Sequence, residues 1–288
     1  MLVRSFGVVS LVLLVAALVL VALANLVVWR VQERIVFQPT PPPYPSDAGW
    51  ARITYAAQDG QPLFAYVLGD RATATGAVIA FHGNADLAVN QIWWADELAR
   101  RAGVLVVVPE YRGYAGLGGT PGYAASQDDA RAAYALVRDT LAVPADRVTL
   151  YGHSLGAAIA ATLAAEVAPR ALLLESPFTS IRAMGAYLLT PRVPALWRLI
   201  ARLHWDTEAL VAGLDSPVWV AHGARDRVIP ARMGAAVHAA ARVKGRLLIV
   251  PEAGHNDVRG AGGGEYERWL IAAVTGARPP LPPPLSPN

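Results

Sequence analysis

Cysteine is absent from the 288-residue chain, and lysine occurs once, at position 244. The absence of cysteine excludes disulfide bonds, cysteine nucleophiles and thiolate metal ligands. The chain also lacks a basic cluster with interleaved aromatic residues, because its arginines are scattered singly among acidic residues and its net charge is only +3. Nucleic-acid binding is therefore not expected. Neither a His-Glu-x-x-His sequence nor a Cys/His metal spacing occurs, so we expect no metal and no cofactor.

The beginning of the chain is strongly apolar. Residues 6–28 are an almost unbroken run of Val, Leu and Ala, which as a helix would be about 35 Å long, enough to cross a hydrocarbon core of ~30 Å. We expect residues 1–30 to be a single transmembrane anchor, with Trp29 at the membrane interface. A cleaved signal peptide is the alternative, because Ala22-Leu23-Ala24 has the small-x-small pattern. The positive charges on the two sides of this segment are nearly equal, so they give little indication of its orientation in the membrane. An extracytoplasmic (periplasmic) position of the remaining chain is slightly favoured.

After this leader, short apolar segments alternate with helical patterns. The predicted strands are residues 52–56, 63–68, 77–81, 104–109, 148–151, 171–175, 218–222 and 247–250, and the predicted helices are residues 87–102, 124–141, 157–167, 231–243 and 265–274. This alternation predicts an α/β fold with a mostly parallel sheet covered on both faces. We expect residues 31–50, rich in proline, to be a stiff connector, residues 51–277 to be one domain, and residues 278–288 to be a disordered proline-rich tail. The glycine run 260–264 lacks the Lys-Ser/Thr of a phosphate loop and is expected to be flexible.

A G-x-S-x-G sequence, Gly152-His153-Ser154-Leu155-Gly156, stands between a predicted strand and an alanine-rich helical segment. This strand–turn–helix setting is typical of a nucleophile elbow, where a serine on a sharp turn adopts strained backbone angles. Residues two before and two after the serine are then crowded, which explains glycine at 152 and 156. The helix that follows directs unpaired N–H groups toward whatever the hydroxyl attacks. Ser154 is therefore the candidate nucleophile.

A serine nucleophile needs a base, and the base needs a third group to orient it. After an elbow of this kind an acid and then a histidine are expected, each following a late strand. Asp226 lies four residues beyond the predicted strand 218–222, and His255 follows the predicted strand 247–250. Both belong to the sheet edge that carries Ser154, so they are the candidate acid and base.

Other residues compete for these roles. Glu175, at the end of the predicted strand 171–175, also satisfies the chain order and is the rival acid. His153 flanks the nucleophile but is expected to pack into the domain, and His222 has no matching position. Asp257 is expected to cap a helix or to stabilise a turn.

The oxyanion of an acyl-transfer reaction needs two fixed backbone N–H donors. One should be the N–H of Leu155, which follows the nucleophile. The other should come from the loop after the first buried strand, where Asn84 is the candidate and Ala85 the next choice. Gly83 allows the main chain to turn toward the substrate.

Several separate motifs carry a resemblance to a known family. They are His82-Gly83-Asn84-Ala85, Tyr111-Arg112-Gly113-Tyr114, Gly119-Thr120-Pro121, the serine motif, Glu175-Ser176-Pro177-Phe178-Thr179-Ser180, His222-Gly223-x-x-Asp226-x-x-Ile229-Pro230, Gly254-His255-Asn256-Asp257 and Ile35-Val36-Phe37-Gln38-Pro39. Together they resemble the α/β-hydrolase superfamily, in particular its membrane-anchored branch of serine-aminopeptidase-like and depalmitoylase-like enzymes. The resemblance implies an α/β-hydrolase fold and a cofactor-free serine hydrolase with the triad Ser154, Asp226 and His255.

The resemblance is incomplete at positions that bear on the substrate. The branch usually has an acidic residue after the Thr-Pro turn, where this chain has Gly122-Tyr123, and often glycine where it has Asp86. The N-terminal cysteine cluster that such depalmitoylases use for membrane targeting is also missing. These departures leave the substrate open.

Residues 178–214 occupy the position of a small helical cap, and many of them are apolar. An apolar roof over Ser154 would suit an acyl chain, although helix-on-sheet packing is the simpler interpretation for most of these side chains. Arg192, Arg198 and Arg202 could lie against a lipid headgroup, but solvated surface arginines are the more ordinary interpretation.

These observations favour a serine hydrolase of carboxylic esters or thioesters, with small acyl or lipid-like substrates and no obligate protein partner. A serine peptidase or aminopeptidase of the same fold is the alternative, but it would need an acidic group for the free amine, and the cap offers no compelling candidate. A non-catalytic binding protein tethered to a membrane is the third hypothesis.

Overall fold

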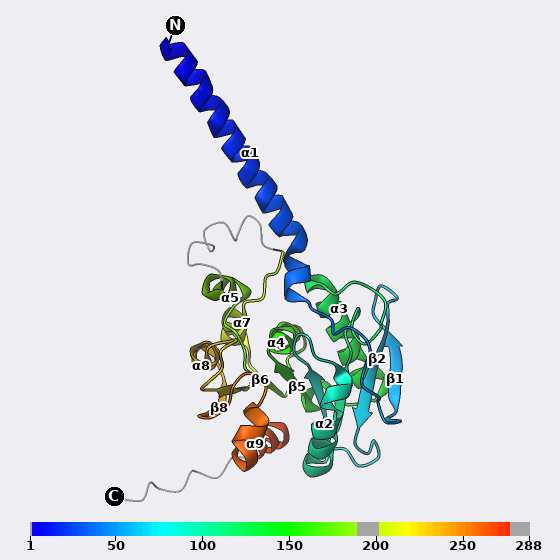
Figure 1. The fold of residues 1–288 in the computed structure, drawn as a ribbon. Coiled ribbons are helices and arrows are strands. Elements are labelled where there is room, and N and C mark those ends of the chain that lie inside the picture. Colours follow the sequence, from blue (N-terminus) through cyan, green and yellow to red (C-terminus); the bar gives the residue numbers. More distant parts are fainter. Residues whose placement is uncertain (1, 189–201, 277–288) are drawn as a thin grey trace, which may run out of the picture.

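The computed structural model describes residues 2–188 and 202–276, whose arrangement is shown in Figure 1. In this part of the chain an eight-stranded sheet has the order β1-β2-β4-β3-β5-β6-β7-β8. The hairpin β1–β2 and the pair β2–β4 are antiparallel, and the later pairs are parallel. The strands are β1 (Arg52–Ala56), β2 (Pro62–Leu68), β3 (Ala77–Phe81), β4 (Leu105–Pro109), β5 (Val148–His153), β6 (Ala171–Glu175), β7 (Val218–Gly223) and β8 (Lys244–Val250).

Helices cover both faces of this sheet because its central strands are apolar on both sides. Every residue of β3, β4 and β6 is buried. α2 and α9 pack together on one face, and α3, α4, α7 and α8 pack on the other. The helices are α1 (Leu2–Val36), α2 (Ala88–Ala102), α3 (Tyr123–Ala135), α4 (Leu155–Val167), α5 (Ile181–Leu188), α7 (Thr207–Gly213), α8 (Ala231–Ala240) and α9 (Val258–Thr275). The predicted α/β architecture with a mostly parallel sheet is confirmed.

The carboxyl ends of the parallel strands lie at one edge of the sheet. Phe81, the last residue of β3, pairs with Gly152 near the end of β5. Gly223, the last residue of β7, pairs with Val250, the last residue of β8. The loops that follow β3, β5, β7 and β8 therefore leave the sheet close together, which is where ligands of such folds bind.

The first helix extends away from the domain, and only its end meets it (Figure 1). Gln32 and Phe37 are buried, and the Phe37 ring lies 5.8 Å from the ring of Trp205. Residues 31–50, predicted as a connector, thus contact the domain at their beginning. Of the residues that the structure describes, no helix combines the length and the hydropathy that a membrane crossing requires.

The glycine run is where the structure departs most from the prediction. Residues 260–264, expected to be flexible, lie inside α9, which contains a kink at Gly263 (φ +45°, ψ −131°). Tight packing explains a small residue here, because a Cβ on Gly262 would lie 2.9 Å from Tyr266 Cβ and 3.2 Å from Val250 Cγ2. Tertiary packing thus overrides the low helix propensity of glycine.

The described parts of the predicted cap, residues 178–214, are residues 178–188, which include α5, and residues 202–214, which include α7. Met184, Leu203 and Trp205 are buried in the core, so these apolar residues pack against the domain, whereas Leu188 is 65% exposed. Arg192, Arg198 and the rest of residues 189–201 lie outside the described residues, as does the predicted tail, residues 278–288.

Candidate active site

Ser154 occupies a sharp turn between β5 and α4, with φ +54° and ψ −115°. A non-glycine residue with positive φ is strained, and here the neighbouring glycines make the turn possible. A Cβ on Gly152 would meet the carbonyl oxygen of Gly156, and a Cβ on Gly156 would meet the carbonyl oxygens of Phe81 and His82. The expectation that both glycines are steric requirements agrees with these contacts.

The structure brings Ser154, His255 and Asp226 together in one line. Ser154 Oγ lies 2.9 Å from His255 Nε2, and His255 Nδ1 lies 2.7 Å from Asp226 Oδ2. Because the carboxylate can only accept, Nδ1 carries the imidazole proton and Nε2 is free to accept the proton of the serine hydroxyl. The three residues are supplied by the loops after β5, β7 and β8.

Asp226 is held in place through both of its carboxylate oxygens. Its Oδ1 accepts the backbone N–H groups of Val228 and Ile229, both at 2.8 Å, and its Oδ2 lies 3.2 Å from His222 Nε2 as well as near His255. Burial alone would raise the pKa of Asp226, but the hydrogen bonds from His222, His255 and Ile229 outweigh it and hold the pKa well below its usual range. Asp226 is therefore ionised at any physiological pH.

His222 was not predicted to take part in this site. Its Nε2 donates to the carbonyl oxygen of Ile229 at 2.9 Å and also approaches Asp226, whereas its buried Nδ1 has no partner among the described residues. A Cβ on Gly234 would meet Nδ1, so α8 packs directly on this ring. The His-Gly-x-x-Asp spacing in the sequence is the signal that could have indicated it.

His153 packs into the domain, as expected, and it also lies beside the candidate base. Its Nε2 donates to the backbone carbonyl of His255 at 3.0 Å, and the two rings lie 5.1 Å apart. Burial lowers the pKa of His153, which keeps this ring neutral beside His255. Asp257 stabilises the same loop as the predicted turn residue, since its Oδ1 accepts the Gly254 N–H at 2.6 Å.

The loop after β3 lies next to the nucleophile. A Cβ on Gly83 would be 3.5 Å from Ser154 Cβ. The loop starts at the buried residue His82, whose Nε2 lies 2.9 Å from Glu110 Oε1. Among the turn and loop hydrogen bonds of the described residues, the backbone N–H of Asn84 donates to no main-chain oxygen. Leu155 is the first residue of α4, where N–H groups have no partner within the helix.

Glu175, the rival acid, is bound elsewhere. Its carboxylate accepts the hydroxyl of Tyr151 at 2.9 Å and that of Tyr266. Both tyrosines belong to the core between the sheet, α2 and α9. The geometry therefore gives the position beside His255 Nδ1 to Asp226.

Comparisons with known proteins agree with this architecture. The family model described as serine aminopeptidase, S33, matches residues 72–208. The uncharacterized protein Rv2307c of Mycobacterium tuberculosis is 33% identical over 262 residues, covering 88% of this chain and 89% of that protein. The human α/β-hydrolase domain-containing protein 17B is 30% identical over 178 residues, covering 62% of this chain and 59% of that protein. These sequence matches and the observed fold support a place in the α/β-hydrolase superfamily.

Solved structures show the same fold at low sequence identity. The esterase domain of a Rhodothermus marinus protein aligns with this chain at a TM-score of 0.58 and 19% identity, covering 78% of this chain and 98% of that domain. The Pyrococcus furiosus esterase Pf2001 aligns at a TM-score of 0.61 and 15% identity, covering 84% of this chain and 97% of the esterase.

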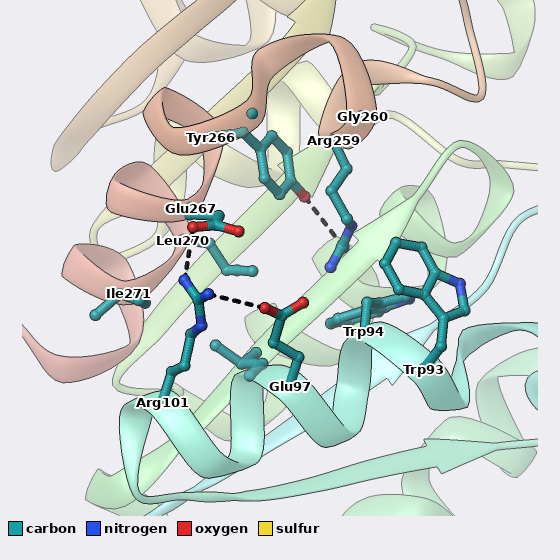
Figure 2. Close-up of a pocket in the computed structure, with 12 residues that line it drawn as sticks. Trp93, Trp94, Glu97, Arg101, Arg259, Gly260, Tyr266, Glu267, Leu270 and Ile271 are labelled. Carbon is teal, nitrogen blue, oxygen red and sulfur yellow. Dashed lines mark hydrogen bonds and ion pairs between the residues drawn. The ribbon is translucent and has the colours of Figure 1, made fainter.

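The structure also has a cavity of about 220 Å³ between α2 and α9, whose lining contains none of Ser154, Asp226 and His255 (Figure 2). The charged groups on its wall are paired, because Arg101 bridges Glu97 at 3.0 Å and Glu267 at 2.6 Å. The Arg259 guanidinium lies 3.8 Å above the Trp94 ring. This cavity is part of the packing between the two helices and lies apart from the candidate site.

Proposed function

We propose that the protein is a serine hydrolase that cleaves carboxylic esters or thioesters of acyl or lipid-like substrates through an acyl-enzyme intermediate. The observation that carries this proposal is the hydrogen-bonded line from Asp226 through His255 to Ser154 at a strained turn. Ser154 is the nucleophile, His255 the base and Asp226 the orienting acid. The N–H groups of Asn84 and Leu155 form the oxyanion hole.

The proposed reaction follows from the positions of the protons. The Ser154 oxygen bonds to the carbonyl carbon of the substrate while its proton passes to His255 Nε2. The tetrahedral intermediate then expels the alcohol or thiol, which takes that proton from His255. A water molecule repeats the sequence on the acyl-enzyme, so that the carboxylic acid leaves and Ser154 regains its proton.

A membrane attachment through residues 1–30 belongs to the same proposal. Within α1 the described apolar side chains are widely exposed, for example Leu13 at 65% and Leu20 at 66%. A continuous exposed apolar surface of this kind favours a lipid or protein environment over water. Sedimentation with membranes after alkaline carbonate washing tests whether the full chain is anchored. Mass spectrometry of its N-terminus tests the alternative of a cleaved leader. A reporter fused to the C-terminus decides between the extracytoplasmic and the cytoplasmic side.

A peptidase remains the second candidate because the matching family model is described as a serine aminopeptidase. The same catalytic groups could cleave an amide, but an aminopeptidase needs an acidic group for the substrate's free amine. In the described part of the cap, Asp206 is occupied as the N-cap of α7, accepting the Ala209 N–H at 3.1 Å. Turnover of aminoacyl amides in parallel with acyl esters and thioesters separates the two functions.

A fluorophosphonate probe tests the nucleophile directly. The wild-type chain should be labelled at Ser154 and should hydrolyse short p-nitrophenyl esters, whereas Ser154→Ala should lose both properties while retaining its thermal unfolding temperature. Thr162→Ala, which removes a hydroxyl from α4 away from the site, is a matched control that should stay active. A folded wild-type chain that is neither labelled nor active would favour a non-catalytic binding protein.

A further inference from the structure

The side chain of Asn84 connects the proposed oxyanion loop to the segment that follows α1. Asn84 Nδ2 donates to the carbonyl oxygen of Val36 at 2.5 Å, and Asn84 Oδ1 accepts the backbone N–H of Gln38 at 2.9 Å. The amide thus pairs with the main chain on both sides of Phe37. The hydroxyl of Tyr114 donates to the same Oδ1 at 2.9 Å. Both the nitrogen and the oxygen of this side chain are thus hydrogen-bonded, and none of these three partners lies within its own loop.

A second contact fixes the next residue of the loop. The hydroxyl of Thr40 donates to the carbonyl oxygen of Ala85 at 2.9 Å. Ala85 has a φ of +55°, a conformation that an alanine adopts only when its surroundings enforce it. The segment of residues 36–40 therefore holds both Asn84 and Ala85 in place from outside.

The segment is itself docked on the domain. Phe37 is buried against Trp205, at the base of the cap. One turn earlier, Glu33 Oε1 accepts the backbone N–H of Tyr123 at 3.0 Å, and Glu33 Oε2 lies 3.3 Å from Arg202. Figure 1 shows α1 ending at this place, beside α3. The segment is therefore anchored independently of the loop that it holds.

We propose that residues 36–40 are a positioning element of the active site, which acts through the Asn84 side chain, Tyr114 and Thr40 to fix the oxyanion hole. This inference rests on the proposed function. The Asn84 N–H can stabilise an oxyanion only if its direction is set before charge develops, because the stabilisation depends on preorganised donors. Two groups from the segment and one from Tyr114 set that direction.

Conservative variants of the full chain test the proposal. Tyr114→Phe removes the hydroxyl that supports Asn84 Oδ1, and Thr40→Val removes the hydroxyl that supports Ala85. Loss of a complete oxyanion donor lowers kcat by roughly 10²–10³-fold, so partial release of the loop should lower it about tenfold in each variant. The double variant should lose about 100-fold, whereas KM should change less than about twofold because substrate binding is largely unaffected.

A transition-state analogue distinguishes positioning from general destabilisation. A trifluoromethyl ketone forms a hemiketal with the serine and places its oxyanion in the hole, so its Ki should rise by the same factor as kcat/KM falls. Thr40→Ser keeps the hydroxyl and should retain wild-type kcat. Tyr134→Phe removes a phenolic hydroxyl from α3 and should also retain it.

The outcomes separate this inference from the proposed function. If the wild type is labelled and active but Tyr114→Phe and Thr40→Val match its kcat and its Ki, the positioning role is refuted while the hydrolase assignment stands. If the variants lose activity only in proportion to a lower folded fraction, with Ki unchanged in the folded protein, the role is refuted as well. If the folded wild type is neither labelled nor active, the proposed function fails and this inference fails with it.

Discussion

Replacing Asp226 by asparagine tests the proposed triad at its most constrained member. Oδ1 of residue 226 accepts two backbone N–H groups, from Val228 and Ile229. In Asp226→Asn the amide oxygen must take that position, so its NH2 group faces His255 Nδ1. An NH2 group can only donate, so Nδ1 becomes the acceptor and the imidazole proton moves to Nε2. His255 Nε2 can then no longer accept the proton of Ser154.

The expected loss can be worked from the distance between the two groups. An imidazolium forms at His255 in the transition state, and its Nδ1 lies 2.7 Å from Asp226 Oδ2. At an effective dielectric constant of about 20, two unit charges at this separation attract each other by about 6 kcal/mol. Each 1.36 kcal/mol corresponds to a factor of ten in rate, so the loss of this attraction can lower kcat by at most about 10⁴-fold. Because the amide keeps a dipole, we expect kcat to fall 10³–10⁴-fold in Asp226→Asn.

The assay is steady-state hydrolysis of a p-nitrophenyl ester, with the folded fraction of each variant measured by thermal unfolding. Glu175→Gln is the matched control, because it removes the rival carboxylate while leaving Asp226 in place. Its activity per folded molecule should stay within about threefold of wild type. Its unfolding temperature should fall, because an amide replaces the buried carboxylate that accepts the hydroxyls of Tyr151 and Tyr266. The reasoning is refuted if Asp226→Asn stays within tenfold of wild type, or if Glu175→Gln loses more activity than Asp226→Asn.

Two further predictions concern the turn and the pH dependence. Gly156→Ala should abolish activity and lower the unfolding temperature by several degrees, because the new Cβ would meet two carbonyl oxygens. Gly213→Ala is the control, because a Cβ there has open space, and it should change neither property. An active and stable Gly156→Ala would contradict the steric argument. The lowered pKa of Asp226 means that its ionised form stabilises the folded state above the unfolded value of about 3.9 and that this stabilisation is lost as the pH falls toward the folded value. The difference in free energy of unfolding between wild type and Asp226→Asn, measured with urea, should therefore narrow between pH 5 and pH 2, and a constant difference would contradict it.

The sheet could be predicted from the sequence because its central strands are buried on both faces. Short, wholly apolar runs between helical patterns are typical of buried parallel strands, and the bounds of β1, β3 and β6 match the prediction. The end of the helix predicted over residues 124–141 was less predictable, because α3 ends at Ala135 and continues as a π-helical turn, Leu136–Thr140. Helix type depends on local hydrogen bonding that residue periodicity does not encode.

The candidate triad could be named from the sequence because each member follows a strand, and strand ends converge. The contacts that support the triad and the oxyanion loop could not be predicted from the sequence. Asn84 and Gln38 are 46 residues apart, and no periodic pattern indicates that an amide in one loop will pair with the main chain of another. His222 was overlooked although the His-Gly-x-x-Asp spacing places it near Asp226, because the contact itself depends on how the loop after β7 folds back.

The division of labour along the chain has a practical consequence. Ser154, Asp226 and His255 leave the sheet after β5, β7 and β8, whereas the insertion between β6 and β7 supplies none of them. Under the proposed function, the catalytic residues and this insertion are therefore separate segments of the chain. Exchange of that insertion for one from another superfamily member should change which substrates are hydrolysed without changing the proposed catalytic residues.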